Sequence, residues 1–553
     1  MSRKGWTIVI VAVALGALLV CGALAAVAGY VYLARPADKA SAVQVTPLST
    51  REAGPVNGEL HLVGSLPPTL DPALVQDSTS GEYVVHLFSG LVSLNADLEI
   101  VPALAERWEM SADGRVYTFS LHPDAAFGDG KPITAQEVVD SLSRACSPDL
   151  ASPVALSYLG DIVGAEEYSL GQAESIQGLE VVDEHTLRIT IDSPKSYFLA
   201  KLTYPTAAVV DLEEVEREPQ TWFTDPNPSG PFGLEELSKE RIVLARNDRY
   251  VGKQASITRA VYDLSASSPM TQYETGEIDI TAFGGDEIDR VLDPYNPLHN
   301  EYVGFPELSV QYLGLNVEQA PFDDPLVRRA FAYAIDREKL ANLVLNQTAL
   351  PAYTVLPPTM PGYTESAPGT VPTYDPEEAR RLLAASSYGS ADRLPPIALT
   401  VAGTTGYLSP VDEAVMAMIE ESLGIAMTAE QVDWADMLED MNRQRYQLYS
   451  AGWIADYPDP QNFIDVQFYS KSAQNHTGYA NSEVDALLEK ARVEQDEGRR
   501  SELYAEAERI VLNDAPWITL THGYAYYLVK PYVQGFRGDA ALYPWLCDIT
   551  IVD

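Results

Sequence analysis

The chain is organised around one stretch, residues 452–460, with the sequence Gly-Trp-Ile-Ala-Asp-Tyr-Pro-Asp-Pro. It follows residues 446–451, where apolar and polar residues alternate enough to predict a short strand. Pro458 and Pro460 fix their own φ angles and favour extended backbone at the residues before them. The stretch therefore predicts a stiff loop that holds an indole, a phenol and two carboxylates in fixed directions. Such a loop suits a cationic, partly apolar ligand, although most loops of this composition are surface turns.

Length and charge narrow the class of protein. A chain of 553 residues is too long for one hydrophobic core and indicates two or three lobes. Its 79 acidic and 37 basic residues give a net charge of −42, which argues against nucleic acid as a partner. The charge suits a cationic ligand, or solubility alone. Cys146 and Cys547 are far apart in the sequence, and we expect no disulfide between them.

Residues 1–35 are predicted to target or anchor the protein. Arg3 and Lys4 precede an uncharged run from residue 6 to residue 33, which exceeds the roughly 20 apolar residues that span a bilayer. An uncleaved membrane anchor is the first interpretation, with a cleaved signal peptide or a lipid attached at Cys21 as alternatives. All three interpretations place the remainder outside the cytoplasm. Residues 36–57 are rich in proline, serine and threonine and are predicted to form a flexible linker.

Strand and helix patterns alternate through the rest of the chain, which predicts an α/β fold. Asp324 and Pro325 supply an N-cap and a first-turn proline for a helix over 324–340. On that helix, Arg328 and Arg329 are expected on a solvent-exposed or lobe-bridging face. Further predicted elements are a helix opened by a capping box at 134–137, a long helical region at 483–512, and two strands at 516–521 and 524–529.

Seven separated segments resemble one family in the same order along the chain. They are PALAERW at 102–108, YTFSLH at 117–122, FGDGKPITA at 127–135, NPSGPF at 227–232, PFDDPLVRRA at 321–330, the stretch at 452–460, and LVKPYV at 528–533. Together they resemble the family 5 extracellular solute-binding proteins, the oligopeptide- and dipeptide-binding subunits of ABC importers. The resemblance extends from about residue 59 to the end of the chain.

The resemblance implies a two-lobed clamp of the periplasmic-binding-protein type II class with an inserted accessory subdomain. Lobe I would comprise residues 58–87, 202–307 and 525–553, the accessory subdomain 88–201, and lobe II 308–524. A short peptide, or another amine-bearing solute, would lie between the lobes, and hinge closure would present it to the permease subunits of the importer. The expected protein is a monomer without cofactor, metal or catalytic residues. It would be anchored by its N-terminal segment at the cell surface or on the periplasmic side of the cytoplasmic membrane.

The resemblance also assigns the site. In peptide-binding members, the aspartate of the Gly-Trp-x-x-Asp motif binds the ligand's amino group, and Asp456 holds that position here. A carboxylate in a closed cleft needs a compensating cation. Trp453 is expected to line a side-chain pocket, with core packing as the alternative, and Asp459 is expected to form a turn. The remaining candidates for ligand binding are Gly452, Tyr457, Tyr312 and Ser78.

One departure from the family pattern affects the expected ligand. Oligopeptide-binding members meet the peptide's carboxyl terminus with lysine, histidine and arginine. The corresponding positions here are Leu345, Ser409, Met441 and Ser450. None of them is basic, although Arg443 and Arg445 are near enough in sequence to substitute. An amino group on the ligand is therefore better supported than a carboxylate, and both peptide length and a non-peptide cationic solute stay open.

Two other function classes compete with an importer subunit. A ligand sensor of the same fold would look the same in this chain, but no signalling domain precedes Trp6, which favours the importer. A glycoside hydrolase would need a carboxylate pair, for example Asp456 with Asp459. The sequence lacks a His-Glu-x-x-His zinc motif, a Gly-x-Ser-x-Gly elbow and a Walker A loop. We therefore expect a binding protein without catalytic activity.

Overall fold

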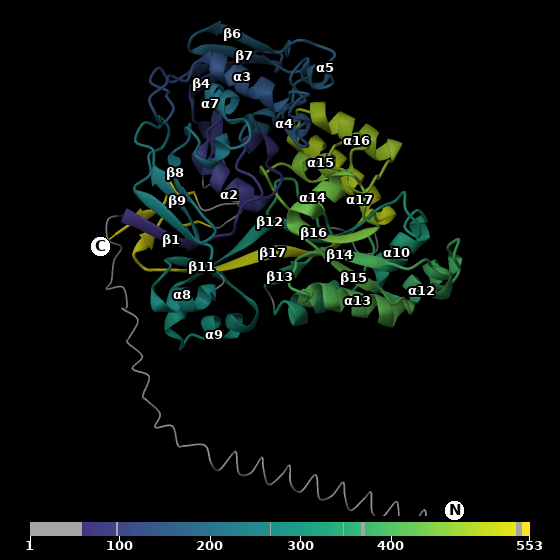
Figure 1. Cartoon of the computed structure of the whole chain (residues 1–553). Helices are drawn as coiled ribbons and strands as arrows, with labels where there is room; N and C mark the ends of the chain where they lie inside the picture. The colour runs from purple at the N-terminus through teal and green to yellow at the C-terminus, as the bar shows by residue number, and fades with distance from the viewer. Residues whose placement is uncertain are drawn as a thin grey trace, which may run out of the picture. The chain divides into compact units, whose positions relative to one another are not determined.

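The computed structural model describes residues 58–95, 98–265, 267–346, 348–365, 371–537 and 545–552. The predicted membrane segment at 1–35 and the predicted linker at 36–57 lie outside the described residues. None of the helices within these ranges combines the length and the apolar composition needed to cross a membrane. Residues 53–553 belong to one structural unit, which contains three larger sheets (Figure 1).

The first sheet lies in the predicted lobe I and has the strand order β1-β10-β9-β8. The helix α2 (Ser78–Leu87) packs against it, where the rings of Tyr83 and Tyr262 meet edge-on with centroids 5.0 Å apart. Asp77 begins α2 by accepting a hydrogen bond from the Ser80 backbone N–H at 3.0 Å. The strands of this sheet are β1 (Glu59–Val63), β8 (Phe232–Leu237), β9 (Arg241–Arg246) and β10 (Arg259–Asp263).

The second sheet contains two long strands, β12 (Tyr302–Leu315) and β17 (Trp517–Val529). They pair along most of their length, but the register shifts between Pro306 and Val310. Figure 1 shows β17 as a long yellow strand in the middle of the view, with β11 near one end and β14 near the other. The order is β11-β17-β12-β16-β14-β15, with β13 paired to β17. Its other strands are β11 (Ile280–Phe283), β13 (Ala349–Pro351), β14 (Ala398–Ala402), β15 (Thr428–Val432) and β16 (Leu448–Ile454).

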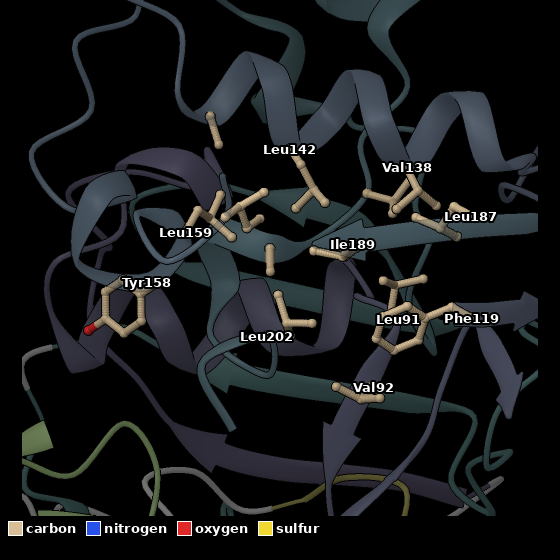
Figure 2. Close-up of a cluster of buried hydrophobic side chains, with 14 of the residues drawn as sticks. Leu91, Val92, Phe119, Val138, Leu142, Tyr158, Leu159, Leu187, Ile189 and Leu202 are labelled. Carbon is tan, nitrogen blue, oxygen red and sulfur yellow. The ribbon is translucent and has the colours of Figure 1, made fainter. Parts of the chain in front are cut away.

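The third sheet forms the predicted accessory subdomain, in the antiparallel order β4-β5-β7-β6. The helix α3 (Ala135–Ala145) covers it and begins with the predicted capping box of Thr134 and Glu137. Figure 2 shows the apolar cluster between them, with Tyr158 of α4 (Ala155–Leu159) at its edge and the hydroxyl directed away from the other side chains. The strands are β4 (Ala105–Met110), β5 (Val116–Leu121), β6 (Leu179–Asp183) and β7 (Thr186–Thr190).

Helices cover both faces of the second sheet in the predicted lobe II and form two apolar clusters with it. They are α10 (Pro325–Ala334), α11 (Arg337–Lys339), α12 (Pro376–Ala385), α13 (Pro410–Leu423), α14 (Trp434–Asn442), α15 (Ile464–Phe468), α16 (Ser482–Val493) and α17 (Glu497–Asp514). The remaining helices are α5 (Ala165–Ser169), α6 (Phe198–Lys201), α7 (Leu212–Arg217), α8 (Pro269–Thr275) and α9 (Ile288–Leu292). Two short strand pairs complete the set, β2 (Val92–Leu94) with β3 (Ile100–Pro102) and β18 (Val533–Gln534) with β19 (Thr550–Ile551).

Several predicted boundaries are wrong. The helix predicted over 324–340 ends at Ala334, because Asp336 caps a new turn by accepting from the Lys339 backbone N–H at 3.0 Å. The helical region predicted over 483–512 is two helices, because Asp496 caps the second one. The two strands predicted over 516–529 are one strand, β17, which runs through Gly523.

The expected position of Arg328 on an exposed or lobe-bridging face is also wrong. Its side chain is buried, and the guanidinium donates hydrogen bonds to the carbonyl oxygens of Asp514 at 2.8 Å and Phe322 at 2.7 Å. One of these carbonyls is at the end of α17 and the other is shortly before α10. They satisfy the guanidinium, and no local sequence pattern indicates these partners.

The division into two lobes and an accessory subdomain stays a prediction. Two of its boundaries, at 307/308 and 524/525, fall inside β12 and β17. The pairing of these two strands is interrupted there, between Pro306 and Val310. Loss of regular pairing lowers the resistance of a strand pair to bending. These two predicted boundaries thus coincide with the irregular part of the strand pair.

The turn at Gly230 supports α2 and provides a test of the fold. Its N–H donates to the Leu87 carbonyl at 3.0 Å, and an added Cβ would lie 2.6 Å from the His86 carbonyl oxygen. We expect Gly230→Ala to destabilise the protein by at least about 2 kcal/mol, because the contacted atoms are backbone and move together with α2. Chemical denaturation measures this, with Gly498→Ala as the control, since the nearest atom to a Cβ there is 3.4 Å away. A Gly230→Ala protein as stable as the control would contradict this packing.

Candidate ligand-binding cavity

The stretch at 452–460 starts as strand and only then becomes a loop. The strand β16 continues to Ile454, and Gly452 pairs with Gln311 of β12. The prediction that the loop begins at Gly452 is therefore wrong by three residues. Asp459 forms the expected turn: it accepts from the Gln461 backbone N–H at 2.9 Å and starts a 3-10 helix at Pro460–Asn462.

A second interaction fixes this turn. The carboxylate of Asp459 receives two hydrogen bonds from the guanidinium of Arg500 on α17, at 2.9 and 2.5 Å. Paired carboxylate and guanidinium groups of this geometry are stronger than a single hydrogen bond. Asp459 is thereby committed to the turn and is not among the residues that line the cavity described below.

Asp456 receives its hydrogen bonds on one oxygen. The Tyr158 hydroxyl donates to Oδ2 at 2.5 Å, and the Asn462 amide donates to the same oxygen at 2.7 Å. The Asn462 Oδ1 in turn accepts from the Asp456 backbone N–H at 2.9 Å and from the Trp453 indole at 3.3 Å. Among the described residues, no donor lies on the other carboxylate oxygen, Oδ1 of Asp456. One acceptor of this carboxylate therefore remains available.

The surroundings of Asp456 disfavour its charge. Burial raises the pKa of Asp456 from its ordinary value of 3.8 to about 6, although the hydrogen bonds from Tyr158 and Asn462 act in the opposite direction. The two donors are neutral, so they reduce the cost of the buried charge without cancelling it. The side chain keeps part of its surface accessible, because it faces a cavity.

This cavity, here the Asp456 cavity, contains about 740 Å³ of space free of protein atoms, counting the part open to solvent. Small-ligand sites commonly enclose ~300–1,000 Å³. Of the six predicted site residues, five line it: Ser78, Tyr312, Gly452, Trp453 and Asp456. Other polar and aromatic lining residues, none of them predicted, are Gln76, Asp77, Tyr204, Trp434, Gln474 and His476.

Tyr457 is the predicted site residue that does not line the Asp456 cavity. It is 1% exposed, and its hydroxyl donates to Gln461 Oε1 at 2.5 Å. Its ring packs into the apolar cluster of the predicted accessory subdomain, edge-on to Tyr158 with centroids 6.4 Å apart. The ring of Tyr158 is stacked on Tyr204 at 3.6 Å. Tyr457 thus contacts the residue that binds Asp456 and does not face the cavity itself.

A local sequence pattern indicates some of the site residues that were not predicted, and not others. Asp77, which was not predicted, is the N-cap of α2 and directly precedes the predicted Ser78, the first residue of that helix. The Asp-Ser-Thr-Ser sequence at 77–80 carries this capping signal. Tyr158 and Asp456 are 298 positions apart, so no local pattern indicates that contact.

His476 links two sides of the cavity. Its Nε2 lies 3.1 Å from Asn442 Oδ1, and the Asn442 amide donates to Gln76 Oε1 at 2.7 Å. Burial lowers the pKa of His476 to about 4. The ring is therefore neutral near pH 7 and acts as a polar lining group.

Arg443 and Arg445, expected as substitutes for the family's basic residues, are paired elsewhere. Arg443 forms an ion pair with Glu439 at 2.5 Å, and Arg445 forms one with Asp440. Both side chains are more than half exposed, at 52% and 56%. Neither lines the Asp456 cavity, so the expected substitution is not supported by their positions.

The family is decided by comparison with known proteins. Residues 99–475 match the family model described as bacterial extracellular solute-binding proteins, family 5. The chain belongs to this family. It is 32% identical over 496 residues to the periplasmic oligopeptide-binding protein OppA of Salmonella typhimurium, covering 87% of this chain and 89% of OppA. It is 29% identical over 503 residues to the probable deoxycholate-binding periplasmic protein YgiS of Escherichia coli, covering 89% of this chain and 92% of YgiS.

Two solved structures of one relative can be compared with the arrangement of this fold. The Escherichia coli murein tripeptide binding protein MppA superimposes with a TM-score of 0.83 at 26% identity, covering 90% of this chain and 99% of that chain. The unliganded open form of MppA gives a TM-score of 0.65, covering 90% and 98%. Because the two MppA structures share one sequence, the difference reflects how the parts of the fold are arranged. In the arrangement of its parts, this family 5 protein is less similar to the unliganded open form of MppA than to the first MppA structure.

The raised pKa of Asp456 gives a testable stability difference. The folded-state value lies above 3.8, so the carboxyl's stabilising contribution is present at pH 4 and is lost as the pH rises to about 6. We expect Asp456→Asn to raise the unfolding free energy of the ligand-free protein at pH 8 by up to about 2 kcal/mol, and to have no stabilising effect at pH 4. Denaturation at the two pH values measures this, with Asp436→Asn on the exposed face of α14 as the control. A variant no more stable than the wild type at pH 8 would contradict the buried charge.

Proposed function

We propose that this family 5 protein is the substrate-binding component of a peptide ABC importer, and that Asp456 binds the amino group of a short peptide in the cavity. The observation that carries the proposal is the free oxygen of a partly buried carboxylate that faces a cavity. An ammonium group at Oδ1 supplies the missing positive charge. Such a charge-assisted hydrogen bond contributes roughly 1.5–3 kcal/mol.

The lining of the cavity supports capture between two lobes. Asp77 and Ser78 come from the start of α2 in the predicted lobe I. Trp453 lies in β16, and Asp456 follows two residues after that strand ends, both in the predicted lobe II. A ligand in the cavity therefore contacts elements on both sides of the irregular region between β12 and β17. Closing around a ligand buries it, and opening releases it to the permease.

Both polar and apolar contacts join the two sides. The hydrogen bonds include that of Tyr158 to Asp456, that of Asn442 to Gln76, and weak ones of Gln474 to the Pro153 carbonyl and of Gln495 to the Pro194 carbonyl, both at 3.5 Å. The buried ring of Tyr457 adds an apolar contact with the predicted accessory subdomain. The guanidinium of Arg500 also lies 5.3 Å from the ring centroid of Tyr197. A hydrogen bond between neutral groups contributes about 1 kcal/mol, whereas the one from Tyr158 to the Asp456 carboxylate contributes roughly 1.5–3 kcal/mol. A ligand that bridges the two sides adds its own contacts and shifts the equilibrium toward the closed arrangement.

The names of the relatives support a peptide ligand, but they do not agree on one class of ligand. OppA is named as an oligopeptide-binding protein, whereas YgiS is named as a probable deoxycholate-binding protein. Deoxycholate is an anion, and the Asp456 cavity carries two carboxylates, which favours the peptide. In the proposed setting, the predicted anchor at 1–35 tethers a monomeric binding protein on the outer side of the cytoplasmic membrane, where the permease receives the ligand.

The amino-group role of Asp456 has a direct test. We expect Asp456→Asn to weaken binding of free-amino peptides at least tenfold, because a neutral amide leaves the ammonium uncompensated. Calorimetry with peptides of two to five residues, and with their N-acetylated forms, measures this. Asp436→Asn removes the same charge outside the cavity and should leave the affinity unchanged. Equal affinity for free and N-acetylated peptides, together with a silent Asp456→Asn, would contradict the role.

A further inference from the structure

Among the residues that the structure describes, the ionisable side chains that line the Asp456 cavity include no formal cation. Two are carboxylates, Asp77 and Asp456, two are tyrosines, and one is His476. The stretches of chain that the structure leaves undescribed after residue 57 are 96–97, 266, 347, 366–370, 538–544 and 553, and none contains lysine, arginine or histidine. An unseen internal residue therefore cannot add a positive charge to this lining.

Burial lowers the pKa of His476 to about 4 and so holds the ring in its neutral form. The Asn442 amide group donates to Gln76, so the Asn442 carbonyl oxygen is the group that faces His476 Nε2. An acceptor at that position favours a hydrogen on Nε2, while the ring as a whole is buried at 8% exposure. The ring thus acts as a polar link between Asn442 and the cavity and supplies no cation.

The arginines nearest in sequence to the cavity residues already have carboxylate partners. Arg443 pairs with Glu439 and Arg445 with Asp440, and Arg500 binds Asp459 through two hydrogen bonds. Arg492 binds Asp465 in the same way, at 2.7 Å for both bonds. Moving one of these groups into the cavity would leave a carboxylate unpaired, which is costly where the pair is buried.

The remaining walls suit a cation. Trp434 and Trp453 line the cavity with partly exposed rings. Tyr204 and Tyr312 also line it, but each is buried and stacked on another ring, Tyr158 and Trp517 respectively. The faces of aromatic rings attract positive charge, by about 0.5–2 kcal/mol for each well-placed contact. The protein's net charge of −42 raises the local concentration of cations further. A ligand carboxylate placed among these groups would meet two like charges and no partner.

We infer that the Asp456 cavity selects ligands of net positive charge and binds no ligand carboxylate through a cation. The inference rests on the proposed function for the location of the site, and it deepens that function by naming the ligand class. Peptides with a basic side chain or a blocked carboxyl terminus fit this class, and acidic peptides do not. A free carboxyl terminus then weakens binding, because it must stay in solvent or be buried beside Asp77 and Asp456.

A competition experiment tests the ligand class. The full-length protein in detergent is offered an equimolar library of two- to five-residue peptides with free amino termini, each sequence present as the carboxylic acid and as the amide. Bound peptides are recovered by ultrafiltration and quantified by mass spectrometry. We expect the amides to be enriched threefold or more over the acids. An amide-to-acid ratio above two supports the inference, and a ratio of two or below overturns it.

A variant separates the charge of the cavity from that of the whole surface. Asn is as good an N-cap as Asp, so Asp77→Asn keeps α2 intact and removes one carboxylate from the lining. We expect the amide-to-acid ratio to fall at least twofold in Asp77→Asn and to stay unchanged in Asp436→Asn. An unchanged ratio in Asp77→Asn, or an equal fall in both variants, overturns the assignment of the preference to the cavity.

Recovery of no peptide in either form would reject the proposed function, and the charge inference is then tested separately. Calorimetry compares 1,5-diaminopentane with glutarate, two five-carbon ions of opposite charge, and with deoxycholate. Binding of the diamine alone supports the inference. Binding of either anion, or of none of the three probes, overturns it.

Discussion

The candidate site depends on a partly buried carboxylate, Asp456, that has no cationic partner among the residues that the structure describes. Asp456 lies at the end of β16, where Tyr158 and Asn462 donate to one of its oxygens and leave the other facing the cavity. Neutral donors reduce the cost of a buried charge, but only an opposite charge removes it. In the proposed function the ligand's ammonium group provides that charge. Because the ammonium group removes the cost of the partly buried charge, the site prefers amine-bearing ligands.

The same interaction couples binding to the arrangement of the fold. Tyr158 belongs to the predicted accessory subdomain and Asp456 to the predicted lobe II, so their hydrogen bond exists only when these parts are together. The long strands β12 and β17 connect the two sides, and their pairing is interrupted midway. An irregular strand pair between the two sides suits a ligand-controlled closure, because a ligand that bridges them can then shift the equilibrium between arrangements.

Local chemistry made much of the fold predictable. The capping box at Thr134 and the cap at Asp324 start helices where the sequence indicates, because a cap depends on its immediate neighbours. Tertiary contacts set the rest. Gly523 resembles a turn between two strands, yet long-range pairing with β12 and β13 carries β17 through it. Arg328 is buried because distant carbonyls accept its hydrogen bonds. The motif located Asp456 but not Tyr158, whose place beside it is fixed by packing on Tyr204.

The most direct test is a crystal structure of the protein with the ligand that it retains when purified without unfolding. The account predicts a bound molecule in the Asp456 cavity, with a protonated nitrogen at hydrogen-bond distance, about 2.7–3.0 Å, from Oδ1 of Asp456. The hydrogen bonds of Tyr158 and Asn462 to Oδ2 should remain. A ligand carboxylate or another anion at that oxygen, or a ligand bound outside the cavity with Asp456 unoccupied, would contradict the account.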